Sequence, residues 1–148
     1  MTTAIAFTVP GKPQGKARPR MTRTGHTYTP KQTVCYENRV RLMAAEAMQG
    51  GAAWEGPVEL SMVVVMERPQ SHYGTGKNAG KVKTTAPAVC CRLPDLDNVI
   101  KAISDACSNG IVYRDDRQIV SLHCERQWAG EYTKPGVYVK MREQEIES

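Results

Sequence analysis

Runs of apolar residues of strand length occur at four places along the chain. Residues 4–9 form such a run, which Pro10-Gly11 stops, and predict a first strand. Val58–Met66 is apolar nearly throughout, which predicts a central strand with both faces covered. Residues 118–128 and 136–142 predict two further strands, the second of which closes the sheet. Within 118–128 one face is expected to carry Ile119, Ser121, His123 and Glu125, and the other Val120, Leu122, Cys124 and Arg126.

Two other segments have the apolar spacing of amphipathic helices. The first starts at Pro30 and ends at Gly50-Gly51, and its predicted apolar face consists of Val34, Val40, Met43, Ala44 and Ala47. The second covers residues 96–108 and ends at Asn109-Gly110, a helix stop signal. Its predicted apolar face consists of Leu96, Val99, Ile100, Ile103, Ala106 and Cys107.

Residues 11–31 and 67–93 lack periodicity and predict loops, while residues 111–113 predict a short strand or a turn. The 67–93 loop is long for a compact domain, and such loops are commonly functional or disordered. The order of elements predicts an α+β fold, a small mixed and mostly antiparallel sheet with two main helices packed on it. The length of 148 residues suits a single domain over residues 1–148.

Composition is that of an ordinary globular protein, with 41% hydrophobic and 24% charged residues, but the charge is unevenly distributed. Against the single acid Glu37, residues 10–41 contain Lys12, Lys16, Arg18, Arg20, Arg23, Lys31, Arg39 and Arg41. Residues 68–92 contain Arg68, Lys77, Lys81, Lys83 and Arg92, and no acid. Two basic stretches beside an acidic cluster at 95–116 suggest a polyanion held next to a metal ion. The alternative is a solvated surface that happens to be basic.

The predicted DNA contacts come from both basic loops: Lys16, Arg18, Arg20, Arg23, Lys77, Lys81 and Lys83. The charge of the 67–93 loop favours a segment that orders on DNA, and the alternative is a tolerated insertion. The cysteines are odd in number and include no CxxC pair. Neither a signal peptide nor a membrane-spanning apolar run is evident in the sequence. A reducing cytoplasm is therefore the expected location.

Candidate chemistry concentrates in residues 94–116, where Asp95 and Asp97 flank the start of the second predicted helix. Carboxylates at this position commonly cap free backbone amides. Capping accounts well for one aspartate, but less well for two with a further pair at Asp115 and Asp116. Asp95, Asp97 and one member of that pair could instead bind Mg²⁺, which prefers oxygen ligands. Adjacent residues of an extended segment point to opposite sides, so only one of the pair should face the ion.

Lys101 follows Asp97 by one helical turn and precedes Asp105 by another, so the three share a stripe opposite the apolar face. The simple interpretation is a solvated ion pair with Asp97, worth roughly 0.3–0.5 kcal/mol. The functional interpretation is a cation that touches a phosphate or a leaving oxygen. The surrounding acids favour the functional one. Asn98 has either a ligand-orienting or a capping role, and the sequence does not decide between them.

Two other motifs fit this segment less well. An EF-hand would need a further oxygen donor at Val99 and a glycine at Ile100, so it fails. DLDNV also resembles the nucleophile motif of haloacid-dehalogenase-type phosphatases, which should end a hydrophobic strand. Cys-Cys-Arg-Leu-Pro precedes it here, which leaves a metal-dependent phosphatase as a weak alternative.

The basic loop KARPRMTRTGHTYTP and the segment DLDNVIKAISDACSNGIVYRDDRQIV (95–120) together resemble the RusA family of Holliday junction resolvases, common in prophages. The resemblance covers most of the chain. It implies a cytoplasmic, Mg²⁺-dependent endonuclease of recombination and repair, with Mn²⁺ as a substitute ion, acting as a homodimer that nicks two opposed strands of a four-way junction.

Matched position by position, the resemblance implies that Asp95, Asp97 and Asp116 bind the metal and that Lys101 is the essential lysine. The 67–93 connection is longer than in compact members, and Cys90-Cys91 stands where polar residues are expected. These departures leave the acids intact but leave the preferred cleavage sequence open. The competing hypothesis is a non-catalytic, structure-selective DNA-binding protein whose acids only cap helices and turns.

Overall fold

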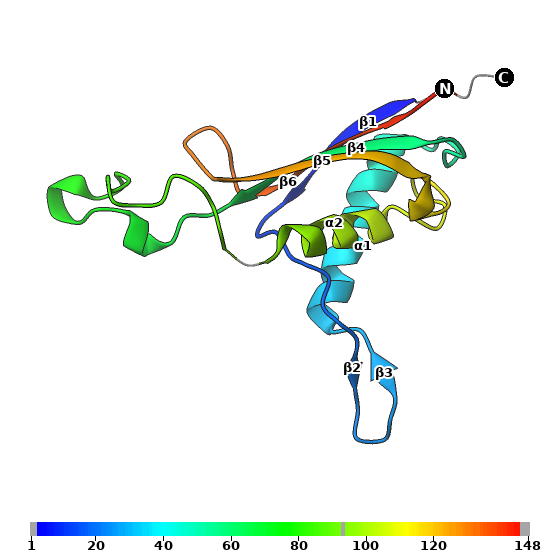
Figure 1. Ribbon diagram of the computed structural model, residues 1–148, viewed down its shortest axis with the longest axis horizontal. Helices are drawn as coiled ribbons and strands as arrows, with labels where there is room; N and C mark the ends of the chain where they lie inside the picture. The colour runs from blue at the N-terminus through cyan, green and yellow to red at the C-terminus, as the bar shows by residue number, and fades with distance from the viewer. Residues whose placement is uncertain (1–2, 93, 146–148) are drawn as a thin grey trace.

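A four-stranded sheet forms the centre of the protein in the computed structural model, which describes residues 3–92 and 94–145 (Figure 1). The strand order is β1 (Ala4–Pro10), β6 (Gly136–Glu143), β4 (Val58–Met66) and β5 (Ile119–Trp128). β6 is antiparallel to both neighbours, whereas β4 and β5 are parallel. The mixed, mostly antiparallel sheet confirms the predicted α+β fold.

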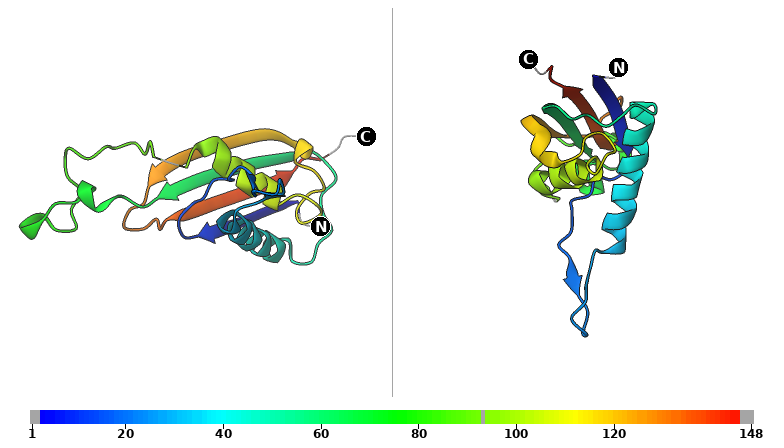
Figure 2. Two further views of the ribbon diagram at one scale, coloured as in Figure 1. Left: turned by 90° about the horizontal axis from the view of Figure 1, so that it is seen from below. Right: turned by 90° about the vertical axis from the view of Figure 1, so that its right-hand side faces the viewer.

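Helices α1 (Lys31–Met48) and α2 (Leu96–Ala106) lie on one face of the sheet, where they enclose the core (Figure 2). α2 follows its prediction: Val99, Ile103 and Ala106 are buried, and Cys107 caps the helix. The left-handed backbone at Asn109 (φ 58°) and Gly110 (φ 94°) makes the predicted stop. No helix of the described residues is long and apolar enough to span a membrane.

The predicted apolar face of α1 is partly wrong. Val40 and Ala44 are buried as expected, but Val34 is 40% exposed and Tyr36 is buried in its place. The first turns of α1 extend past the edge of the sheet (Figure 1). There the helix packs against the chain near Gln14 rather than against the sheet, so the buried side chain is Tyr36, which contacts Gln14.

The prediction that β4 is covered on both faces is also largely wrong. β4 is central, but burial alternates from Val58 to Met62, and only Val64–Met66 are buried in succession. Because both helices pack on the same side, the other face of the sheet is left open along most of the strand.

A β-bulge changes the predicted faces of β5. Val58 pairs with Ile119, but the next residue of β4, Glu59, pairs with Ser121. Val120 is the additional residue, and it reverses the alternation that follows. Ile119 and Cys124 were expected on opposite faces, yet both pack against the core.

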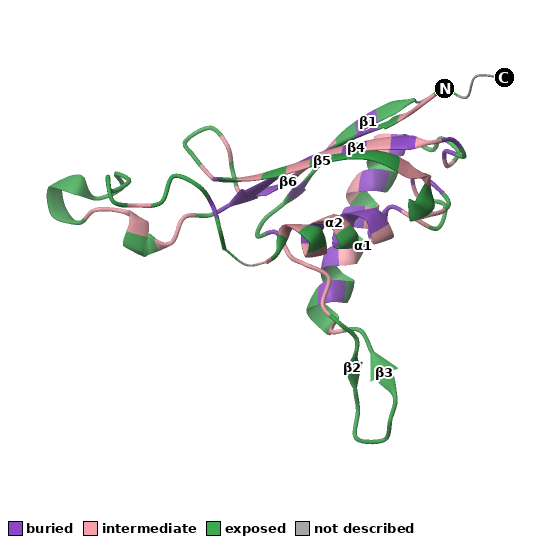
Figure 3. Cartoon of the chain, viewed as in Figure 1, coloured by how far each residue is buried: buried purple, intermediate pink, exposed green. Residues whose placement is uncertain are grey.

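Both long predicted loops contain local structure. Residues 11–31 include a hairpin of β2 (Arg20–Met21) and β3 (Thr27–Tyr28), exposed along its length (Figure 3). Residues 67–92 form an arm with two 3₁₀ helices, η1 (Gln70–His72) and η2 (Gly76–Asn78). Leu93, the last residue of the predicted loop, lies outside the described residues. The hairpin and the arm leave the body in different directions (Figure 1). Residues 111–113 form a turn rather than a strand, with an isolated bridge from Tyr113 to Trp54.

Candidate active site

Asp95 is the N-cap residue of α2, but its side chain does not cap the helix. Its backbone is extended (φ −63°, ψ 144°), and its carbonyl accepts from the amides of Asn98 at 3.1 Å and Val99 at 3.2 Å. The carboxylate makes no capping hydrogen bond. Simple helix capping therefore does not account for the Asp95 side chain.

Asp97 lies in the first turn of α2, and Lys101 lies one turn further on. Both side chains are exposed, and among the described residues neither has a hydrogen-bond or ion-pair partner. The i,i+4 ion pair between them, the simple interpretation of this spacing, is not formed. The carboxylates of Asp95 and Asp97 at the start of α2 and the ammonium group of Lys101 at its middle thus remain unpaired among the described residues.

The chain returns to α2 through a tightly bonded turn. The amide of Val112 donates to the Cys107 carbonyl at 3.0 Å, and the amide of Asn109 donates to the Arg114 carbonyl at 3.1 Å. The buried Tyr113 hydroxyl donates to the Ser104 carbonyl of α2 at 2.6 Å. These bonds hold the segment before Asp115 and Asp116 against the C-terminal end of α2, whereas Asp95 and Asp97 lie at its N-terminal end.

The two adjacent aspartates have different environments. Asp115 caps the 3₁₀ helix η3 (Asp116–Gln118): its carboxylate accepts from the Arg117 amide at 2.8 Å, and its amide donates to the Gln118 side chain at 3.1 Å. The hydrogen bond from the Arg117 amide lowers the pKa of Asp115. Asp115 is therefore committed to a capping box, whereas Asp116 is not.

Asp116 lies in a region of negative potential. Its pKa is raised by burial, then by the hydrogen bond to Asp115 and the charges of Asp105 and Asp115. An added cation would relieve this repulsion by favouring the charged form. The effect of Asp105 shows that η3 and α2 share one electrostatic environment.

The three predicted metal-binding acids are not assembled into a ligand set. Within residues 3–92 and 94–145, no three His, Cys, Asp or Glu side chains have an arrangement that could hold a metal ion. Their donor chemistry nevertheless suits Mg²⁺: Asp95 and Asp97 are unpaired carboxylates, and Asp116 is exposed beside the capping residue Asp115. The assignment of these acids remains a prediction.

Lys16, a predicted DNA contact, forms ion pairs inside the protein. Its Nζ lies 2.7 Å from Asp105 Oδ2 and 3.3 Å from Glu37 Oε1, which links α1 to α2. Burial lowers the pKa of Lys16, but the hydrogen bond to Asp105 and the charges of Glu37 and Asp105 outweigh it, so the pKa is raised. The sequence carries no signal for this contact, because Lys16 and Asp105 are 89 positions apart.

The segment around Gly15 lies directly over the start of α2. The Lys16 amide donates to the Asn98 carbonyl at 3.0 Å, and a Cβ on Gly15 would come within 2.9 Å of the Asn98 Cβ. Only glycine permits this approach. Beside it is a cavity of about 780 Å³, whose lining includes Lys12, Lys31, Arg39, Asp95 and Asn98.

Arg126 of β5 is a site residue that the sequence analysis missed. Its Nη1 donates to the Arg92 carbonyl at 2.6 Å and the Pro94 carbonyl at 2.8 Å, on the backbone that leads into Asp95. Arg126 thereby ties the first acid to the sheet. Alternation along residues 118–128 predicts only the strand face of Arg126 and carries no signal for this contact.

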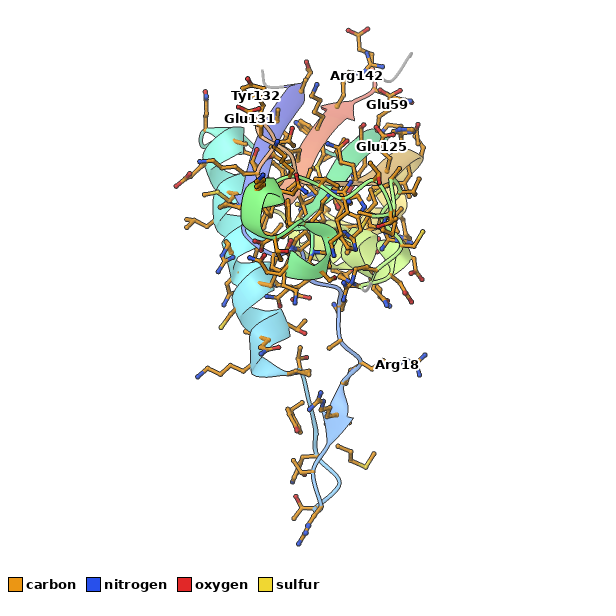
Figure 4. The ribbon with its side chains drawn as sticks, turned by 90° about the vertical axis from the view of Figure 1, so that its left-hand side faces the viewer. Arg18, Glu59, Glu125, Glu131, Tyr132 and Arg142 are labelled. Atoms are coloured by element: carbon orange, nitrogen blue, oxygen red, sulfur yellow. The ribbon has the colours of Figure 1, made fainter. Side chains whose placement is uncertain are left out.

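The other predicted DNA contacts are all exposed and lie on the two projections. Arg18 precedes the hairpin and points away from the body (Figure 4), and Arg20 and Arg23 lie on the hairpin. Lys77, Lys81 and Lys83 lie on the arm. The chain before the hairpin crosses α2 at Asn98, and the arm leads into the same helix end, so both projections start beside Asp95.

The phosphatase alternative is not supported by this arrangement. Its motif should end a hydrophobic strand, but Asp95 follows the arm, whose described residues contain 3₁₀ helices and isolated bridges.

Comparison with known proteins agrees with the geometry. Residues 10–142 match the family model described as endodeoxyribonuclease RusA. The chain is also 31% identical over 142 residues to the uncharacterized protein YqaN of Bacillus subtilis (strain 168), which covers 94% of this chain and 96% of that protein. The chain therefore belongs to the RusA family of endodeoxyribonucleases, enzymes that resolve Holliday junctions.

Proposed function

We propose that this endonuclease resolves four-way DNA junctions in recombination and repair by Mg²⁺-dependent paired nicks. The observation that carries the proposal is a set of unpaired side chains on and just before α2: those of Asp95, Asp97 and Lys101 have no partner among the described residues. A protein that only bound DNA would gain nothing from free carboxylates beside phosphates, because they repel the ligand. The non-catalytic alternative is therefore disfavoured.

In this mechanism Asp95, Asp97 and Asp116 would hold the ion. Bound Mg²⁺, for which Mn²⁺ could substitute, would supply charge to a phosphate oxygen and acidify an attacking water. Lys101 would stabilise the charge that develops on the phosphate or on the leaving 3′ oxygen. Arg126 holds the backbone before Asp95, and Asp115 holds the turn before Asp116.

We further propose a C2 homodimer, the commonest symmetric assembly. One protomer has one set of acids, whereas resolution requires two cuts in opposed strands. A dimer would place two sets on one junction and complete both cuts in one binding event. The reducing cytoplasm remains the proposed location on the cysteine pattern.

A labelled four-way junction incubated with and without Mg²⁺ tests this function. In Mg²⁺ we expect symmetric nicks and release of linear duplexes, and in EDTA we expect binding without cleavage. A linear duplex of the same sequence should stay uncut. Accumulation of singly nicked junctions would contradict the dimer, and equal cleavage of the linear duplex would contradict junction resolution.

The exposed arginines before and on the hairpin should contact phosphates. Each phosphate contact releases counterions and adds about 0.9 to the slope of log affinity against log salt. Replacing Arg18 and Arg20 with alanine should therefore weaken junction binding and reduce this slope by up to about 1.8 for each protomer that contacts the junction. The preference for junction over duplex should not change. Fluorescence anisotropy at several salt concentrations measures both quantities, and an unchanged slope would show that these arginines do not contact the backbone.

A further inference from the structure

A second cavity lies at the end of the sheet, opposite the chain termini. It has a volume of about 750 Å³ and is bordered by the base of the arm and by the turn after β5, marked in Figure 4 by Glu131 and Tyr132. Four cations from separate parts of the chain line it: Lys12, Arg68, Arg92 and Lys134. Glu67 is its only acidic lining residue among those described.

Three of these cations have no internal partner. Arg68 is engaged at the base of the arm: its Nη1 donates to the Pro87 carbonyl at 3.0 Å, and its guanidinium lies 5.2 Å from the Trp128 ring centroid. By contrast, the side chains of Lys12, Arg92 and Lys134 form no hydrogen bond or ion pair with the described residues. Like charges repel one another, and an anion bound between them offsets that repulsion.

The basic cavity connects with the candidate active site through a shared residue. Lys12 lines both this cavity and the one of about 780 Å³ that includes Asp95 and Asn98. A DNA backbone that starts at Asp95 in the first cavity and passes Lys12 would enter the second cavity, which Arg92 and Lys134 line.

The lining favours a phosphodiester backbone over a free nucleotide. A nucleotide site needs a surface for its base, and the aromatic residue here is Trp128, which is only 9% exposed. Arg68 and His72 pack on its ring, and its Nε1 donates to the Pro87 carbonyl at 3.1 Å. The exposed charged side chains of the lining are Lys12, Arg92 and Lys134, with the single acid Glu67.

We propose that Lys12, Arg92 and Lys134 bind backbone phosphates of the DNA arm that leads away from the cleavage point at Asp95. This inference rests on the proposed function and identifies where the substrate continues beyond the acids. The contact is to phosphates, so it contributes affinity and orientation without reading sequence.

The test compares two triple variants with the parent protein, by anisotropy on a four-way junction in EDTA. K12A/R92A/K134A should bind more weakly, and its salt slope should be lower by about 2.7 for each protomer that contacts the junction, or about 0.9 for each contact. K12R/R92K/K134R keeps all three charges and should retain the parent slope. The alanine variant leaves the Arg92 carbonyl in place for Arg126, so folding should be preserved, which thermal melting checks.

A second measurement locates the contacts along the DNA. Neutral methylphosphonates are placed one at a time along one junction arm and parent binding is measured. At contacted positions they should weaken parent binding, and the alanine variant should show no additional loss. Equal salt slopes for the parent and the alanine variant would overturn the proposed phosphate contacts. A DNA arm with no methylphosphonate-sensitive position would overturn them as well. Parent protein that binds junction no better than linear duplex would instead overturn the proposed function.

Discussion

Replacing Asp97 with asparagine should abolish junction cleavage in Mg²⁺ while leaving junction binding intact or stronger. The Asp97 carboxylate is exposed and has no partner among the described residues, so its loss should cost the fold little. Asparagine keeps the shape but removes the charge that would hold the ion and repel phosphate. We expect cleavage to fall by at least about 10³-fold, equivalent to about 4 kcal/mol of transition-state stabilisation.

Asp95→Asn and Asp116→Asn should behave in the same way, and Asp115→Asn is the matched control. Asp115 is adjacent to Asp116 but caps η3, and asparagine also serves well as a cap. Its substitution should therefore affect cleavage much less. Single-turnover rates at saturating protein separate chemistry from binding. Full cleavage by the Asp97→Asn protein would show that Asp97 is not a metal ligand.

Replacing Lys101 with alanine should reduce the single-turnover cleavage rate by orders of magnitude, with a melting temperature within a few degrees of the parent. Lys101 is on the exposed side of α2 and makes no ion pair with the described residues, so the fold loses no contact there. Alanine is also the best helix former. The loss should come from the missing positive charge beside the phosphate.

The control for net charge is Lys140→Ala, which removes an exposed lysine from β6 on the sheet. Its cleavage should stay within a few-fold of the parent in the same assay. If Lys101 is only a solvated surface group, its alanine variant should match the Lys140 variant. A large drop in melting temperature for Lys101→Ala would assign it a structural role instead.

The sequence alone determined the elements whose signals are local. The apolar spacing of α2 and its Asn109-Gly110 stop depend on residues a few positions apart, so both could be predicted. The same is true of the central place of β4 and of the α+β class. The family also followed from sequence, because the spacing of the acids around Lys101 is specific.

Local patterns failed where a neighbouring strand or segment decided the outcome. The bulge at Val120 reversed the faces of β5, because register is set by pairing with β4 and not by alternation within one strand. Val34 is exposed because the first turns of α1 extend beyond the sheet. The hairpin was missed because its strands, such as Arg20–Met21, are too short to show a period.

At the candidate site, the tertiary structure gave a physical distinction between residues that local patterns treat alike. Asp115 and Asp116 are chemically identical neighbours, yet one caps a turn and the other lies in the field of Asp105. Lys16 resembled the other basic-loop residues until the fold brought it to Asp105, 89 positions away. Contacts between distant segments depend on how the helices pack on the sheet, and no local pattern encodes that packing. The sequence therefore predicts the chemical groups of the candidate site, and the tertiary structure shows which of them lack a partner among the described residues.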